Sequence, residues 1–172
     1  MTEPAEVIEP TKVVVEPVEA TALERLQIIQ SAQSVALVGV SANPIRSSNF
    51  VAAYLLRTSW RVYMVNPAYD EVLGERCYAT LADLPEVPDI VDVFRREDAI
   101  PEVTDEAIAV GAKVLWLQLG LRHEPAAATA RAAGLQVVQD RCLKIEHARF
   151  SGRLNLAGFN TGLIASKRRR PI

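Results

Sequence analysis

The chain has 172 residues, of which 49% are hydrophobic and 23% are charged. This length suits one compact domain with its own core, and the composition excludes disordered and fibrous classes of protein. The acidic N-terminus lacks a signal-peptide pattern and no segment is long and apolar enough to span a membrane, so we expect a cytoplasmic protein without membrane contact. Cys77 and Cys142 have the spacing of neither a disulfide framework nor a zinc site, and we expect reduced thiols and no bound metal.

Charge is distributed unevenly along the chain, although the net charge is only −2. Residues 1–20 hold five glutamates and one lysine, whereas residues 141–172 hold eight Lys or Arg and one glutamate. We expect residues 1–20 to form a flexible acidic arm and residues 167–172 a solvated basic tail. Because the whole chain has no basic excess, nucleic acid is not an expected partner.

Apolar runs typical of buried strands alternate with helical patterns between residues 21 and 150. In chain order, we expect helix 21–33, strand 34–40, helix 47–59, strand 60–67, strand 89–94, helix 100–112, strand 113–120, helix 124–134, strand 135–140 and helix 142–150. Residues 70–88 are typical of an irregular connector with a short helix. Strands joined by such helices predict an α/β domain with a mainly parallel sheet of about five strands.

The helix over residues 47–59 follows the first strand directly. Ser47 or Ser48 could supply the oxygen that caps its first turn. Its apolar residues at helical spacing, which we expect to face the core, are Phe50, Val51, Tyr54 and Leu55.

Ligands of parallel α/β sheets bind beyond the carboxyl ends of the strands, where the strand order reverses. The turns at these ends span residues 39–48, 66–67, 94–96 and 118–122. The first turn has the chemistry for an anion, because Gly39 allows close approach of the backbone and Arg46 offers a planar set of donors. The hydroxyls of Ser41 and of Ser47 or Ser48 lie beside the free N–H groups of a helix N-terminus.

The first two turns also limit the choice of nucleotide. A dinucleotide fingerprint has three glycines, and an acidic residue after the second strand that binds the ribose hydroxyls. Here only Gly39 is present, and Asn66 follows the second strand. Both departures disfavour NAD, whereas a ligand with a ribose phosphate tolerates asparagine better than an acid. Coenzyme A (CoA) and NADP both meet this requirement.

Five long segments carry a resemblance to a known family: VGVSANPIRSSNFVAAYL, WRVYMVNPAYDEVLGERCYATLADLP, DIVDVFRR, EAIAVGAKVLWLQLG and AAGLQVVQDRCLKIEHARF. They resemble the bacterial CoA-binding proteins related to the CoA-binding domain of the succinyl-CoA synthetase α subunit. The resemblance spans residues 21–166 and implies a stand-alone, three-layer Rossmann-like domain that binds CoA or an acyl-CoA. Ligase activity is not implied, because the phosphorylatable-histidine domain and the partner subunit of the synthetase have no counterpart here.

The resemblance also implies which residues hold the ligand. The family motifs match the first turn, the turn after the second strand, and the turns after the third and fourth strands. The expected CoA-binding residues are Gly39, Val40, Ser41, Ala42, Arg46, Ser47, Ser48, Asn66, Pro67, Phe94, Arg95, Gln118, Leu119 and Gly120. Two departures from the family pattern, Ser59 for glycine and Leu143 for proline, concern the shape of loops.

Candidate catalytic residues are few. His123 follows the fourth strand, where a base could meet a thioester, but a lone loop histidine is more often merely solvated. His147 is a weaker candidate, and Cys142 could either exchange with a thiol ligand or pack in the core. We expect a binding protein without its own catalytic machinery. The alternatives are an NADP-dependent oxidoreductase, a small thioesterase-like enzyme, and a CoA-responsive regulatory module whose basic tail meets a protein partner.

Overall fold

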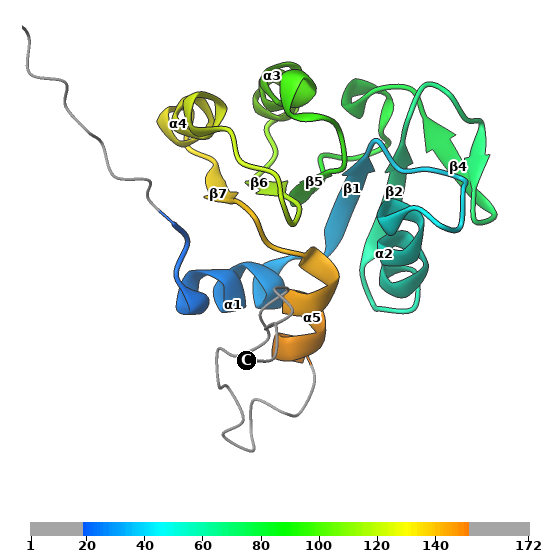
Figure 1. The fold of residues 1–172 in the computed structure, drawn as a ribbon, viewed down its shortest axis with the longest axis horizontal. Helices are drawn as coiled ribbons and strands as arrows, with labels where there is room; N and C mark the ends of the chain where they lie inside the picture. Colours follow the sequence, from blue (N-terminus) through cyan, green and yellow to red (C-terminus); the bar gives the residue numbers. More distant parts are fainter. Residues whose placement is uncertain (1–18, 152–172) are drawn as a thin grey trace, which may run out of the picture.

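The computed structural model describes residues 19–151 as a seven-stranded sheet between two layers of helices (Figure 1). The strands are β1 (Ser34–Val38), β2 (Arg61–Val65), β3 (Glu71–Val72), β4 (Glu75–Tyr78), β5 (Ile90–Val93), β6 (Val114–Leu117) and β7 (Gln136–Val138). The helices are α1 (Ala22–Ser31), α2 (Ser47–Leu55), α3 (Ile100–Val110), α4 (Glu124–Ala132) and α5 (Leu143–Ser151), with short 3-10 turns at Leu81–Asp83 and Glu97–Ala99. The expected three-layer, Rossmann-like architecture is confirmed.

The strand order is β3-β4-β2-β1-β5-β6-β7, and every pair except β3–β4 is parallel. All five predicted strands are present. The two further strands form a short hairpin inside the predicted connector, turning at Leu73 and Gly74, which both have positive φ. Because β3 has two residues and β4 carries two exposed charged residues, neither has the apolar run that identifies a buried strand.

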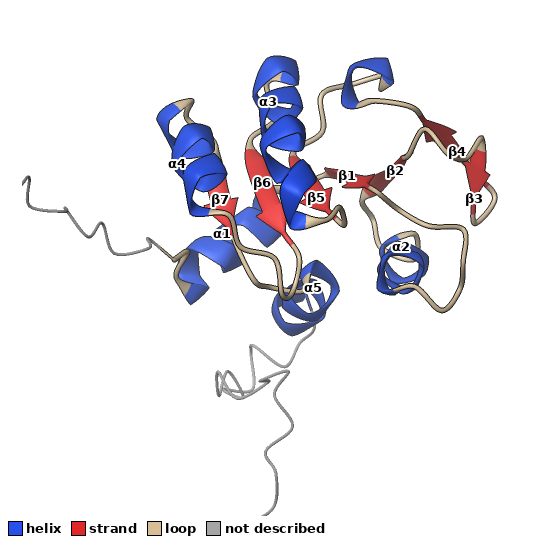
Figure 2. Cartoon of the chain, turned by 45° about the horizontal axis from the view of Figure 1, so that its top comes forward, coloured by secondary structure: helices blue, strands red, loops and turns tan. Residues whose placement is uncertain are grey.

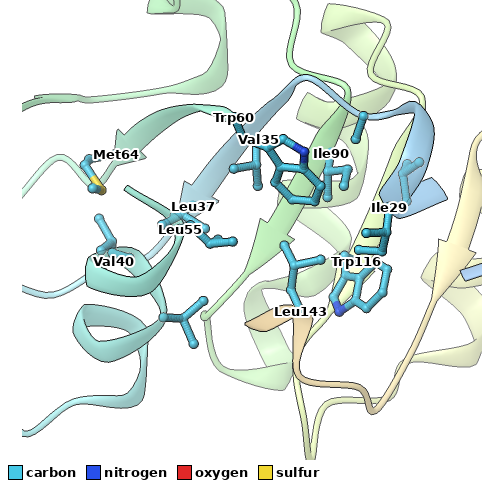
Figure 3. Close-up of a cluster of buried hydrophobic side chains, with 14 of the residues drawn as sticks. Ile29, Val35, Leu37, Val40, Leu55, Trp60, Met64, Ile90, Trp116 and Leu143 are labelled. Carbon is cyan, nitrogen blue, oxygen red and sulfur yellow. The ribbon is translucent and has the colours of Figure 1, made fainter. Parts of the chain in front are cut away.

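Both faces of the sheet are buried, because alternate residues of each central strand point to opposite sides. One face packs against α1, α2 and α5 through residues such as Leu37, Ile90 and Trp116 (Figure 3). The other packs against α3 and α4 through residues such as Val91 and Leu115 (Figure 2). The sheet therefore leaves its carboxyl edge as the place where loops from both layers meet.

The start of α2 differs from the prediction, and so does one of the four residues expected to face the core. Its N-cap is Arg46, which makes no side-chain capping bond, and Ser48 is buried. Phe50 is 63% exposed, and Lys144 Nζ lies 3.7 Å from its ring centroid. Val51 and Leu55 are buried as predicted, and Tyr54 packs half-buried against the core. The buried residues of α2 are Ser48, Asn49, Val51, Ala52 and Leu55, because the first turn of the helix also holds the preceding loop.

Candidate functional site

The strand order reverses at β1, between β2 and β5. The chain leaves β1 through α2 toward β2, whereas it leaves β5 through α3 toward β6 on the other face of the sheet. The Gly39 N–H donates to the Val65 carbonyl at 2.8 Å, and the Phe94 N–H donates to the Val38 carbonyl at 2.8 Å. The predicted first, second and third turns thus start from three strand ends that are tied together.

Gly39 is required by both its conformation and its surroundings. Its φ is +86°, in the left-handed region. A Cβ placed on it would lie 2.7 Å from Arg95 Cδ and 3.1 Å from the Phe94 carbonyl oxygen. The stem of Arg95 therefore passes over the Gly39 backbone, and glycine lets the turns after β1 and β5 approach each other.

The loop between β1 and α2 is held by its own polar groups. The Ser41 N–H donates to Ser48 Oγ at 3.1 Å, and Asn49 Nδ2 donates to the Ser41 carbonyl at 2.9 Å. Ser41 Oγ accepts from the Asn43 N–H at 3.1 Å and lies 3.5 Å from the hydroxyl of Tyr69. Ser48 and Asn49 therefore hold the loop in place. Asn43, Asn49 and Tyr69 are not among the CoA-binding residues predicted from the sequence.

Two arginines border this loop with their side chains exposed. Arg46 precedes α2 and Arg95 follows β5, and neither has an ion-pair partner among residues 19–151. Ala42 and Ser47 are also exposed, whereas Val40 is buried. Because α2 has no side-chain cap, its first N–H groups and the two guanidinium groups are the donors that this edge offers to an anion.

Asn66 connects the turn after β2 to the turn after β1. Its Nδ2 donates to the Val40 carbonyl at 2.8 Å, and its Oδ1 accepts from the Ala68 N–H at 3.0 Å. Pro67 beside it is exposed. Asn66 therefore orders the backbone that faces the site, and an acidic side chain could not donate to Val40 in its place.

The structure divides the residues predicted after β5 and β6 between rim and interior. Leu119 and Gly120 are exposed at the rim, and Phe94 is half-buried. Gln118 instead turns into the sheet, where its Nε2 donates to both carboxyl oxygens of Asp92 at 2.8 and 2.9 Å. In this structure Gln118 therefore hydrogen-bonds to the buried carboxyl group of Asp92. The sequence alone does not predict this contact.

Burial raises the pKa of Asp92 well above its ordinary value of 3.8, because the fully buried carboxyl loses its water, and the hydrogen bond from Gln118 only partly opposes this. The stabilising contribution of the neutral acid is complete below pH 3.8 and is lost as the pH rises toward the folded-state pKa.

Asp92→Asn cannot ionise, so its stability relative to wild type should increase with pH. Urea unfolding at about pH 4 and about pH 7 measures this difference. Equal differences at both pH values would contradict it.

The candidate catalytic side chains occupy structural positions. His123 caps α4, accepting from the Ala126 N–H at Nδ1 at 3.1 Å. His147 is buried, with its Nδ1 3.1 Å from the Tyr54 hydroxyl, and burial lowers its pKa. Burial also raises the pKa of Cys142, which disfavours the reactive thiolate at neutral pH.

Residues 19–151 contain neither a cluster of metal-ligating side chains nor a membrane-spanning helix. No group of three His, Cys, Asp or Glu in this part of the chain could hold a metal ion. None of its helices is long and apolar enough to cross a membrane.

Comparison with known proteins shows which family the chain belongs to. An uncharacterized Bacillus subtilis protein, YneT, is 35% identical over 122 residues, which cover 71% of this chain and 90% of YneT. A hypothetical protein from Pyrococcus horikoshii has a solved structure that is 37% identical, with a TM-score of 0.75 over 84% of this chain and 100% of that one. The ADP-forming acetate–CoA ligase of Methanocaldococcus jannaschii is 27% identical over 88 residues, which cover 51% of this chain but only 12% of the ligase.

The family model described as "CoA binding domain" matches residues 33–148. This range includes the turn at Gly39, both bordering arginines and the rim after β6. The resemblance seen in the sequence is confirmed, and the chain belongs to the CoA binding domain family.

Proposed function

We propose that this domain binds CoA or an acyl-CoA noncovalently at the carboxyl ends of β1 and β5. The carrying observation is the Gly39 turn, where the missing Cβ lets the stem of Arg95 lie close to the backbone of the loop that leads to α2, whose N-terminus has no side-chain cap. Helix N–H groups and guanidinium groups are suited to phosphates. The family assignment supports CoA as the phosphate-bearing ligand.

The turn after β2 favours CoA over NAD. The adenosine of a nucleotide bound at this type of switch point lies toward the second strand, where an acid would bind the ribose of NAD. Asn66 occupies that position, and both polar atoms of its side-chain amide hydrogen-bond to the protein backbone. A phosphorylated ribose thus meets no carboxylate there.

We further propose that the domain has no catalytic machinery of its own. The structural roles of His123 and His147 support this, since each is engaged in a hydrogen bond within the fold. An unidentified protein partner would then act on or respond to the bound ligand. The free thiols of Cys77 and Cys142 are in keeping with a cytoplasmic location.

A titration series tests the ligand. CoA, dephospho-CoA, NADP and NAD are titrated calorimetrically into the full chain, and the thermal midpoint is followed at equal ligand concentrations. CoA should bind most tightly and raise the midpoint with concentration, as a ligand of the native state does. If NAD or NADP binds more tightly than CoA, the ligand proposed here is wrong. If added acyl-CoA is rapidly hydrolysed, the noncatalytic proposal fails.

Arg46→Ala should weaken CoA binding by about 1.5–3 kcal/mol, the range for hydrogen bonds to charged groups. Arg57→Ala is the matched control, because Arg57 is exposed beyond the other end of α2, away from the turn. Calorimetry at moderate salt compares the two variants with wild type. Equal affinities of the Arg46 and Arg57 variants would remove Arg46 from the site.

A further inference from the structure

Two arginines beyond β6 and β7 converge on one carboxylate. Arg122 Nη2 hydrogen-bonds to Glu19 Oε1, and Arg141 Nη2 lies 3.8 Å from Glu19 Oε2. The side chains of Glu19, Arg122 and Arg141 are 49%, 39% and 37% exposed. The hydrogen bond from Arg122, with the charges of both arginines, lowers the pKa of Glu19. Both guanidinium groups therefore bind a carboxylate while remaining accessible.

The loops that carry this arginine pair are joined to each other. The Gly120 N–H donates to Asp140 Oδ1 at 2.7 Å, and the Asp140 N–H donates to the Leu121 carbonyl at 3.1 Å. The Arg141 carbonyl accepts from the buried Trp116 Nε1 at 2.7 Å. The carboxylate of Glu19, by contrast, comes from the segment that leads into α1. The arginines are thus anchored to the sheet, and Glu19 can leave without disturbing those bonds.

The arginine pair lies beyond β6 and β7, on the opposite side of β1 from β2. If the adenosine of CoA lies toward β2, as proposed above, a pantetheine arm that crosses the Gly39 turn would extend toward β5 and β6 and bring the acyl end to this side. Neighbouring strands are about 4.8 Å apart, so the carboxyl end of β6 is roughly 10 Å from that of β1. Arg122 lies two positions after Gly120, which with Leu119 forms the exposed rim.

On the basis of the proposed CoA binding, we propose that Arg122 and Arg141 form a carboxylate site for the acyl group, so that the domain prefers CoA thioesters of dicarboxylic acids. Glu19 occupies this site in the ligand-free chain. Asp140 and Glu124, at 3.7 and 3.9 Å from Arg122, already balance the two positive charges. Exchanging Glu19 for a ligand carboxylate keeps the charge of the cluster and restores the hydrogen bond to Arg122, which an apolar acyl end cannot do.

Matched thioesters test this preference. Malonyl-CoA is compared with propionyl-CoA, and glutaryl-CoA with pentanoyl-CoA, because each pair differs only in replacing a terminal methyl group by a carboxylate. At least one dicarboxylic member should bind about tenfold more tightly than its partner, as expected for a charge-assisted hydrogen bond. Glu19→Gln should tighten that binding by about two- to fivefold, the range for an exposed ion pair, and leave CoA binding unchanged. Asp105→Asn, an exposed acid on α3, is the control.

Arginine variants separate this site from the CoA site. Arg122→Gln and Arg141→Gln should each abolish the preference for the dicarboxylic thioester, with CoA affinity and thermal midpoint close to wild type. If CoA binds but the matched thioesters bind equally, the carboxylate site is wrong and the proposed function stands. If CoA does not bind to the wild type, the proposed function itself fails, and the carboxylate site fails with it.

Discussion

Glu146→Leu is expected to lower the free energy of unfolding by about 3–5 kcal/mol, the cost of removing one partner from a buried ion pair. Glu146 lies on α5 with its side chain 4% exposed, 2.9 Å from Arg25 Nε on α1 and 3.0 Å from Arg149 Nη1. The two arginine side chains are 10% and 14% exposed. Without Glu146, both guanidinium charges would stay buried and lose their shared carboxylate.

The reverse substitution should cost less. In Arg25→Leu, Glu146 keeps Arg149 as an ion-pair partner, so its buried charge remains compensated. Leucine also fills part of the space between α1 and α5 with apolar atoms, which can match a buried pair in stability. The double variant Arg25→Leu/Glu146→Leu should therefore be more stable than the sum of the single losses predicts.

Urea unfolding and the thermal midpoint measure these effects. A loss of this size corresponds to a midpoint lower by roughly 10 °C for a domain of this length. Asp98→Leu is the control, because its ion pair with Arg96 is exposed and should contribute less than about 1 kcal/mol. If Glu146→Leu costs no more than Asp98→Leu, the buried pair does not stabilise the packing of α1 on α5.

The parts of the fold that the sequence predicted are those that depend on local pattern. The run over residues 34–40 is apolar on both faces because β1 lies in the middle of a sheet that is covered on both sides. Gly111 closes α3 in the left-handed conformation, and prolines stand in the first turns of α3 and α4, as expected for helix ends. Each of these features is decided within a few residues.

The parts that were missed depend on contacts between distant residues. Arg25 and Glu146 are 121 positions apart, and both belong to helices whose charged residues would ordinarily face water. From the sequence, Gln118 is predicted at the rim of the site. In the structure, β5 and β6 pair and bring Asp92 beside it. From the sequence, Ser48 is a candidate helix cap. In the structure, the loop folds back and the Ser41 N–H donates to the Ser48 hydroxyl. No spacing in the sequence specifies these partners.

Gly39→Ala is expected to cost about 2–4 kcal/mol of stability and to remove most CoA binding. One part of the cost is the φ of +86°, which disfavours any residue with a Cβ. The other is crowding against Arg95 Cδ at 2.7 Å and the Phe94 carbonyl at 3.1 Å. Gly134→Ala isolates the first part, because Gly134 has φ +94° and nothing within 4 Å of an added Cβ.

Arg95→Ala separates crowding from ligand binding, because it removes the Cγ and Cδ atoms that an alanine at position 39 would meet. In that background, Gly39→Ala should cost less stability than in the wild type, because only the Phe94 carbonyl contact then adds to the cost seen in Gly134→Ala; urea unfolding measures the difference. CoA affinity, measured by calorimetry, should stay low in the double variant, since the guanidinium group is lost as well. Weaker CoA binding by the Arg95→Ala single variant, with stability close to wild type, would assign Arg95 to the ligand. If Gly39→Ala costs the same with and without Arg95, the stem of Arg95 adds nothing to the cost, which then comes from the backbone conformation and the Phe94 carbonyl.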